Sequence, residues 1–131
     1  MQARSDDLIW CDATLMVQAL SNLLLNAAQH SAPGLGIDVR VELQPGRCTL
    51  SVHDHGPGLP PGAEREVFKK FHHGPAPDGH HTGTGLGLAI CEVVTRLHGG
   101  QIEARNRVGA LFEMTLPQPL ERPSLEEAFD D

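Results

Sequence analysis

Residues 22–26 read Asn-Leu-Leu-Leu-Asn, residues 54–58 read Asp-His-Gly-Pro-Gly, and residues 83–88 read Gly-Thr-Gly-Leu-Gly-Leu. A glycine-rich stretch on its own indicates little more than a turn. These three stretches, however, occur in a set order. The first lies in a helical pattern, the second ends a strand pattern, and the third opens another helical pattern. Their order therefore predicts a single domain built around all three.

The first helix is predicted from Asp12, a good N-cap residue, to about His30, where residues 31–34 (Ser-Ala-Pro-Gly) stop it. Its apolar face comprises Met16, Leu20, Leu23, Leu24 and Ala27. Beside that face runs a narrow polar stripe, which comprises Gln18, Asn22, Asn26 and Gln29. This division is typical of a helix that packs one side against a core.

A second long helix is expected after residues 83–88, with Gly99 as its C-cap, and a short helical piece from Ala63 to Phe71. Period-two alternation predicts two hairpins. Their strands are Ile37–Leu43 with Cys48–Asp54, and Gln101–Asn106 with Leu111–Leu116. A further short strand is expected from Leu8 to Cys11. The predicted class is α+β, a two-layer α/β sandwich with three helices over a mixed, mostly antiparallel sheet.

Composition narrows the possible functions. The chain has 131 residues, of which 40% are hydrophobic, and this suits one domain with one core. It contains no apolar run of about 20 residues and opens on no signal peptide, so we expect a cytosolic domain that does not span a membrane. Three widely spaced cysteines indicate reduced thiols. A net charge of -7 argues against a nucleic-acid partner. Much of that charge lies in an acidic tail, residues 118–131, beyond a domain of residues 1–117.

Asn22 and Asn26 are four positions apart and therefore share one helix face. An amide oxygen is a hard, neutral ligand, and Mg²⁺ often takes only one or two protein oxygens, with waters and phosphates completing its octahedron. Asn26 is the stronger candidate for such a ligand. The alternative is two exposed amides on a polar helix face, which would be preferred without the other two stretches.

Asp54 ends a strand whose inward residues are Cys48, Leu50 and Val52, so its carboxylate should point to the apolar side. A buried charge there needs a partner. The exocyclic amine of adenine is a suitable donor and would select ATP over GTP, whose base carries a carbonyl at that position. Gly56 and Gly58 would let the backbone approach the base. A simple Asp-Gly turn remains the alternative.

Residues 83–88 do not match a dinucleotide fingerprint, because the third glycine comes one position early and no strand precedes it. They also lack the Gly-Lys-Ser/Thr ending of a P-loop. What remains is a run of backbone amides entering a helix N-terminus, where the helix dipole favours phosphate. A glycine-rich loop that merely begins a helix is the alternative.

The order asparagine helix, Asp-x-Gly-x-Gly, Phe-x-x-Phe (Phe68 and Phe71), Gly-x-Gly-x-Gly resembles the ATP-binding catalytic domain of sensor histidine kinases. That domain belongs to a superfamily shared with DNA gyrase, heat-shock chaperone and mismatch-repair ATPases. The resemblance extends from Leu8 to Pro117 and implies a Bergerat-type sandwich, with ATP beneath a lid from about Leu59 to Thr82. Residues 56–62, 85–91, 98–100 and 106–107 look most like the potassium-responsive Kdp-type sensors.

The resemblance implies roles for individual residues. Asn22 and Asn26 would be the catalytic pair, with Mg²⁺ on Asn26 and adenine on Asp54. The glycines of the third motif would form the lid hinge and hold the phosphates. The implied nucleotide-binding set comprises Asn26, Gln29, His30, Asp54, Gly56, Gly58, Lys70, Gly83, Thr84, Gly85, Leu86 and Gly87.

The resemblance also separates two activities. The hydrolases of the superfamily usually carry a water-activating glutamate where this chain has Asn22, and an amide is a poor base. Transfer of the γ-phosphate to a histidine on a separate dimerisation domain of the same kinase is therefore expected, with a response regulator downstream. The fragment alone would be a monomer from the cytosolic part of a membrane-anchored sensor.

Two further hypotheses stay open. The family often has a lysine where Gln29 stands, and arginines where Lys69 and Lys70 stand. A regulatory module that binds nucleotide without transferring phosphate is therefore an alternative. The adjacent histidine pairs at 72–73 and 80–81 could bind a transition metal, although neighbouring rings are poorly placed for one ion.

Overall fold

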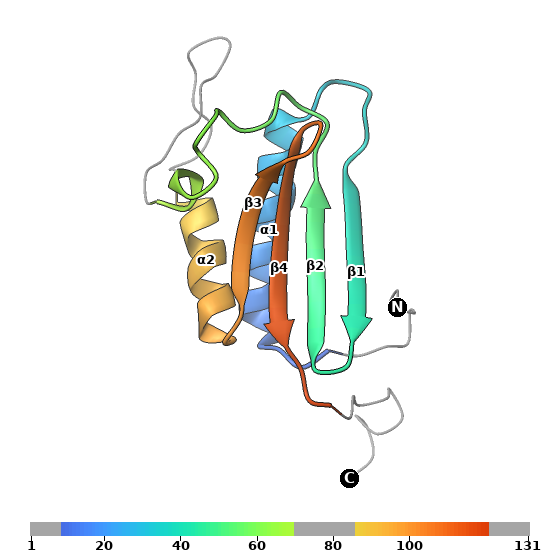
Figure 1. Cartoon of the computed structure of the whole chain (residues 1–131), viewed down its shortest axis with the longest axis vertical. Coiled ribbons are helices and arrows are strands. Elements are labelled where there is room, and N and C mark those ends of the chain that lie inside the picture. The colour runs from blue at the N-terminus through green and yellow to red at the C-terminus, as the bar shows by residue number, and fades with distance from the viewer. Residues whose placement is uncertain (1–8, 70–85, 121–131) are drawn as a thin grey trace.

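The computed structural model describes residues 9–69 and 86–120 of the chain. Two α-helices cover one face of a four-stranded sheet, which gives the two layers seen in Figure 1. The elements in chain order are α1 (Ala13–His30), β1 (Asp38–Gln44), β2 (Arg47–His53), the 3-10 turn η1 (Glu66–Phe68), α2 (Gly87–Leu97), β3 (Gln101–Asn106) and β4 (Ala110–Pro117). Neither described α-helix combines the length and apolar character needed to cross a membrane.

The strands lie in the order β1-β2-β4-β3, and each neighbouring pair is antiparallel. Both predicted hairpins are confirmed, with Asp38 opposite His53 in the first and Asn106 opposite Ala110 in the second. The expectation of a mixed sheet was wrong for the strands described. The last strand, β4, lies inside the sheet next to β2, because the chain crosses over through η1 and α2 before β3 takes the edge.

The prediction of three helices was also wrong for residues 9–69 and 86–120, which contain two α-helices. The described part of Ala63–Phe71 forms only the 3-10 turn η1, because Lys69 already has an extended backbone (ψ 145°). Ile9, Trp10 and Cys11 do not form the predicted strand either. The backbone N–H and C=O of Trp10 are bonded instead to the side-chain amide of Gln118, at 2.7 and 2.9 Å.

The helix ends follow the sequence signals. The Asp12 side chain accepts a 3.0 Å hydrogen bond from Leu15 N–H and caps α1 as predicted. At the end of α2, Gly99 has φ +75° and donates to Arg96 O, while Gly100 N–H donates to Thr95 O, both at 2.9 Å. This pair of bonds is a Schellman motif, which requires a left-handed residue and so explains the glycine.

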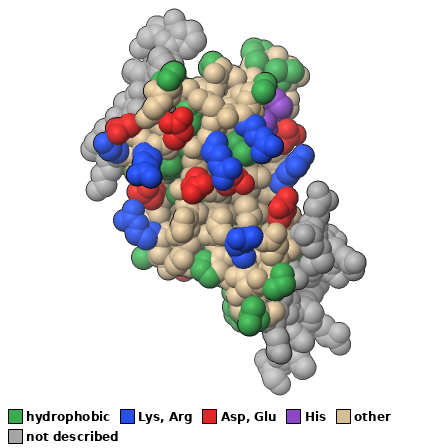
Figure 2. All heavy atoms as spheres, viewed as in Figure 1, with side chains coloured by type: hydrophobic (Ala, Val, Ile, Leu, Met, Phe, Trp, Pro, Cys, Tyr) green, Lys and Arg blue, Asp and Glu red, His purple; other side chains and the backbone are tan. Residues whose placement is uncertain are grey.

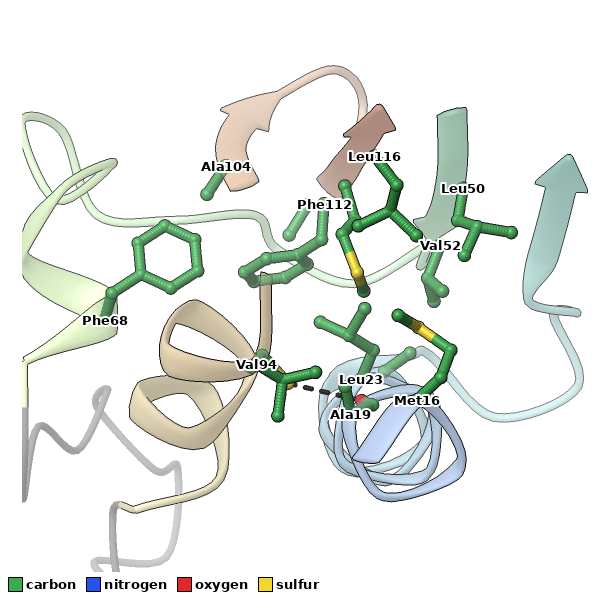
Figure 3. Close-up of a cluster of buried hydrophobic side chains, with 14 of the residues drawn as sticks. Met16, Ala19, Leu23, Leu50, Val52, Phe68, Val94, Ala104, Phe112 and Leu116 are labelled. Carbon is green, nitrogen blue, oxygen red and sulfur yellow. Dashed lines mark hydrogen bonds between the residues drawn. The ribbon is translucent and has the colours of Figure 1, made fainter. Parts of the chain in front are cut away.

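The core lies between the helices and the sheet (Figure 3). Leu23 of α1 and Phe112 of β4 are both almost fully buried there. Phe68 of η1 meets Phe112 edge to face, with 6.1 Å between ring centroids. The two helices are joined directly by the Cys91 thiol, which donates to Ala19 O at 3.2 Å. The predicted Leu24 lies outside this core and is 41% exposed, since the buried face of α1 consists of Met16, Ala19, Leu23 and Ala27.

The other face of the sheet is open and carries charges of both signs (Figure 2). Arg105, for example, forms ion pairs with Glu103 at 3.1 Å and with Glu113 at 2.9 Å. Interleaved charges of this kind describe a solvated surface. The chemistry must therefore be sought at the ends of the elements.

Candidate functional site

One end of the sandwich brings together the segments that carry the sequence motifs. The C-terminal ends of α1 and β2, the turn between β3 and β4, and the N-terminal end of α2 all lie at the upper end of Figure 1. The first of these segments carries Asn26, the second leads into Asp54, and the last contains Gly87. The fold thus gathers all three motifs at one end.

Asp54 is the most buried acidic residue described, with only 1% of its surface exposed. Its Oδ1 accepts two backbone hydrogen bonds, from Gly56 N–H and from Ala110 N–H, each 3.0 Å long. Its Oδ2 is buried and has no hydrogen-bond partner among the described residues. The predicted inward orientation is confirmed. An unpaired buried oxygen is costly in a folded protein unless a ligand or an ordered water supplies a donor.

Two glycines allow the backbone to close around this carboxylate. A Cβ on Gly56 would overlap the carbonyl oxygen of His30, the last residue of α1. A Cβ on Gly109, which has φ +106°, would overlap the carbonyl oxygen of Asp54. Gly56 thus brings the end of α1 against the Asp54 loop, and Gly109 brings the β3–β4 turn against it from the other side.

The asparagine pair divides into two environments. Asn22 is half-buried and donates from Nδ2 to the carbonyl of Gly87 at 3.3 Å, which ties α1 to the first residue of α2. Asn26 is half-buried and its side chain makes no hydrogen bond to a described residue, so its amide oxygen is available to a ligand. Gln29 and His30 are exposed one turn further along the same helix.

The N-terminal end of α2 presents backbone donors. Leu86 precedes the helix, and among the described residues no side chain caps its first N–H groups, which are the type of donors that bind an anion. Four predicted site residues, Lys70, Gly83, Thr84 and Gly85, lie outside the described residues, as do His72, His73, His80 and His81. Within the described ranges, no cluster of three or more His, Cys, Asp or Glu residues could hold a metal ion.

Sequence reasoning did not find the contacts that Ala110 and Gly109 make with Asp54. Ala110 contributes only its backbone N–H, so its side chain gives no indication of this contact. The sequence predicts only that a turn joins Gln101–Asn106 to Leu111–Leu116 here. Its unusual backbone gives no clue in the sequence, because Val108 has φ +49°, a value that β-branched residues rarely adopt.

The chain is thus an α+β domain in which two described helices cover a four-stranded antiparallel sheet, with the half-paired Asp54 carboxylate buried at one end. The model of the family described as "Histidine kinase-, DNA gyrase B-, and HSP90-like ATPase" matches residues 11–120. The chain belongs to this family.

Among curated proteins, the chain is similar to sensor protein KdpD of Escherichia coli (strain K12), with 44% identity over 128 residues, covering 95% of this chain and 14% of that protein. It is also similar to the probable sensor histidine kinase TcrY of Mycobacterium tuberculosis (strain ATCC 25618 / H37Rv), with 39% identity over 116 residues, covering 84% and 24%. The chain thus spans a quarter or less of these two relatives. The predicted resemblance to histidine kinases, Kdp-type sensors included, is confirmed.

Solved structures of histidine kinases are also similar to this chain. The mycobacterial sensor histidine kinase MprB has a TM-score of 0.72 at 33% identity, covering 82% of this chain and 73% of that one. The nucleotide-free catalytic domain of histidine kinase ThkA has a TM-score of 0.73 at 31% identity, covering 83% and 71%. ThkA in complex with the response regulator protein TrrA has a TM-score of 0.73 at 27% identity, covering 92% and 33%.

Proposed function

We propose that this chain binds Mg-ATP and passes the γ-phosphate to a histidine on a separate dimerisation domain, as the catalytic part of a two-component sensor kinase. Membership of the family and the similarity to sensor kinases support this role. The observation that carries it is the buried, unpaired Oδ2 of Asp54. An acceptor buried at the motif end of the fold calls for a donor from a ligand.

The adenine amine supplies that donor. With Oδ1 already held by Gly56 and Ala110, Oδ2 of Asp54 can accept one hydrogen bond from the amine. Guanine places a carbonyl oxygen where adenine has the amine, and two acceptors repel each other. The site therefore prefers ATP over GTP.

Asn26 is the residue that would hold Mg²⁺, because its amide makes no hydrogen bond to a described residue and lies on the helix end that reaches the site. When bound, the ion would neutralise phosphate charge and draw the phosphates into one geometry. The N–H groups at the start of α2, which no described side chain caps, would bind the phosphates. We assign the same role to the remaining motif residues, namely Lys70, Gly83, Thr84, Gly85, Leu86 and Gly87.

Asn22 favours transfer over hydrolysis. Its amide cannot take a proton from water, and its NH₂ group is engaged with Gly87 O. Without a base for water at this position, ATP is held until an outside nucleophile reaches the γ-phosphate. We infer that this nucleophile is a histidine of the same kinase and that a response regulator receives the phosphate next, in the cytosol.

The test is to mix this chain with the dimerisation domain of its own kinase, labelled ATP and magnesium. We expect the acceptor to gain an acid-labile, base-stable label, as a P–N bond requires, and Asn26→Ala to transfer at least about 100-fold more slowly, as the loss of a first metal ligand implies. Gln18→Ala is the matched control, since Gln18 lies on the same polar stripe two turns earlier and is exposed. Undiminished transfer by Asn26→Ala would contradict the metal assignment.

A nucleotide-binding regulatory module is the second candidate function. It is favoured by Gln29, which is exposed at the site end of α1 and offers no positive charge to a phosphate. Tight ATP binding with no transfer to the supplied acceptor, under conditions where Gln29→Lys does transfer, would establish this second function.

A further inference from the structure

A single side chain joins the β3–β4 turn to the loop that follows Asp54. Asn106, the last residue of β3, accepts a hydrogen bond at Oδ1 from Leu59 N–H (2.5 Å) and donates from Nδ2 to Leu59 O (2.9 Å). One amide thus satisfies both backbone groups of a residue 47 positions away. Few side chains other than Asn or Gln could make both bonds, since the arrangement needs a donor and an acceptor side by side.

These two hydrogen bonds between Asn106 and Leu59, which we call the clasp, explain why residue 58 is a glycine. Gly58 has φ +83°, and a Cβ at that position would lie 2.6 Å from Asn106 Oδ1. The sequence predicts Gly58 as room for an approaching base. The structure adds a second reason, because the space beside Gly58 is occupied by the Asn106 amide.

The clasp closes a ring around the Asp54 carboxylate. From Leu59 the chain leads back to Gly56, whose N–H donates to Asp54 Oδ1. From Asn106 it leads across the turn to Ala110, whose N–H donates to the same oxygen. Both donors that fix the carboxylate therefore sit on segments that Asn106 holds together.

The turn itself is strained, which shows that its neighbours hold it in place. Val108 adopts φ +49° although its side chain is β-branched, and such a backbone persists only where the surroundings over-determine it. His53 adds a further contact, because its Nε2 lies 2.7 Å from Arg107 O and 3.2 Å from Val108 O, within reach of a shared N–H.

We propose that Asn106 is a positioning residue for base recognition. By keeping Gly56 N–H and Ala110 N–H on Oδ1, it fixes the carboxylate plane of Asp54 so that Oδ2 faces the adenine amine. Without the clasp the two donors can separate, the carboxylate can rotate, and selection between an amine and a carbonyl weakens. This inference rests on the proposed nucleotide site. It concerns the preference for adenine over guanine and not the binding of the phosphates.

The experiment is calorimetric titration of the whole chain with Mg-ATP and Mg-GTP. The readout is the ratio of the two dissociation constants, which a general loss of stability would not change. The variants are Asn106→Asp, which keeps the shape but loses the donor to Leu59 O, and Asn106→Ser, which keeps a short hydroxyl. Val108→Ala is the matched control, since its side chain lies on the same turn and is 91% exposed.

We expect the parent and Val108→Ala to prefer ATP over GTP by the same ratio of dissociation constants. In Asn106→Asp this ratio should fall about tenfold, and in Asn106→Ser it should fall less. Folded Asn106 variants with the parental ratio would overturn the proposal. So would unfolding of both variants, because a purely structural role would then account for Asn106. A parent without any preference would instead refute the assignment of Asp54, and with it the proposed function.

Discussion

The two ends of the sandwich treat their polar groups differently. At the lower end in Figure 1, the Gln118 side chain bonds to both backbone groups of Trp10 and to Pro117 O, and His98 joins the start of α1 to the end of α2. At the upper end, Asp54 keeps a buried oxygen unpaired and Val108 holds a strained backbone. Both ends connect segments far apart in the sequence.

His98, at the lower end, has both of its polar ring atoms hydrogen-bonded. Its Nδ1–H donates to Val94 O at 2.7 Å, and its Nε2 accepts from Asp12 N–H at 2.9 Å, so both ring nitrogens are satisfied. Asp54 contrasts with His98, because Asp54 Oδ2 has no partner among the described residues. Unpaired buried groups and strained backbones are typical of functional sites, so the upper end is where we propose that the nucleotide binds.

The largest effect is expected from Gly56→Ala. The new methyl group would meet the backbone carbonyl of His30, which cannot move aside as a side chain could, so we expect the free energy of unfolding to fall by roughly 3 kcal/mol. Urea denaturation measures this. Gly36→Ala is the control, since nothing lies near a Cβ there and its φ is not positive. Equal stability of the two variants would show that the upper end is looser than described.

A substitution at the lower end should reduce stability without changing nucleotide preference. Gln118→Ala removes the three bonds of the Gln118 amide, and we expect a loss of roughly 2 kcal/mol in the free energy of unfolding with no change in the ATP to GTP preference. Gln101→Ala, at an exposed position, is the control. A change of preference in Gln118→Ala would mean that the two ends are coupled.

The contact between Gln118 and Trp10 bears on the proposed domain boundary after residue 117, because Gln118 lies just beyond that boundary. We expect a chain ending at Leu120 to bind ATP like the parent, because residues 121–131 follow the last described contact. A chain ending at Pro117 should bind ATP but unfold more easily, since it lacks Gln118. Loss of ATP binding in the Leu120 chain would contradict the boundary.

The smallest effect concerns pH. Burial raises the pKa of the Cys91 thiol to about 12 from an ordinary 9.0. Above pH 9 the unfolded chain releases this proton while the folded chain keeps it, so the free energy of unfolding falls as pH rises towards 12. At pH 10 the loss should be about 1 kcal/mol. Stability curves of the parent and Cys91→Ala between pH 8 and pH 10.5 should therefore converge, and parallel curves would contradict the assignment.

Much of the fold could be predicted because its signals are local. The alternation of Cys48, Leu50 and Val52 set the strand and turned Asp54 inward, and Gly99 marked the end of α2. The failures came from long-range contacts. Trp10 was expected in a strand, but a side chain 108 positions away binds its backbone. Residues 63–71 looked helical, yet the backbone of Lys69 is extended.

The site shows the same division. The inward orientation of Asp54 and the place of Asn26 on α1 could be predicted, because an alternating strand and an amide on a helix face are both visible in the local pattern. Ala110 could not be predicted, since it contributes only a backbone N–H brought to Asp54 by the strand order. The contact of Gly58 with the Asn106 amide could not be predicted, because the sequence does not reveal which atoms fill the space beside this glycine.

If Asp54 Oδ2 accepts a hydrogen bond from the adenine amine, changing this oxygen to an NH₂ group should alter both nucleotide affinity and base preference, and one titration series measures both. In Asp54→Asn, the amide oxygen can still accept from Gly56 and Ala110, so the fold should persist while an NH₂ group faces the base. We predict that Mg-ATP affinity falls by one to about 3 kcal/mol and that the preference shifts towards Mg-GTP, whose carbonyl can accept from that group. A folded Asp54→Asn variant with the parental affinity for both nucleotides would contradict the account.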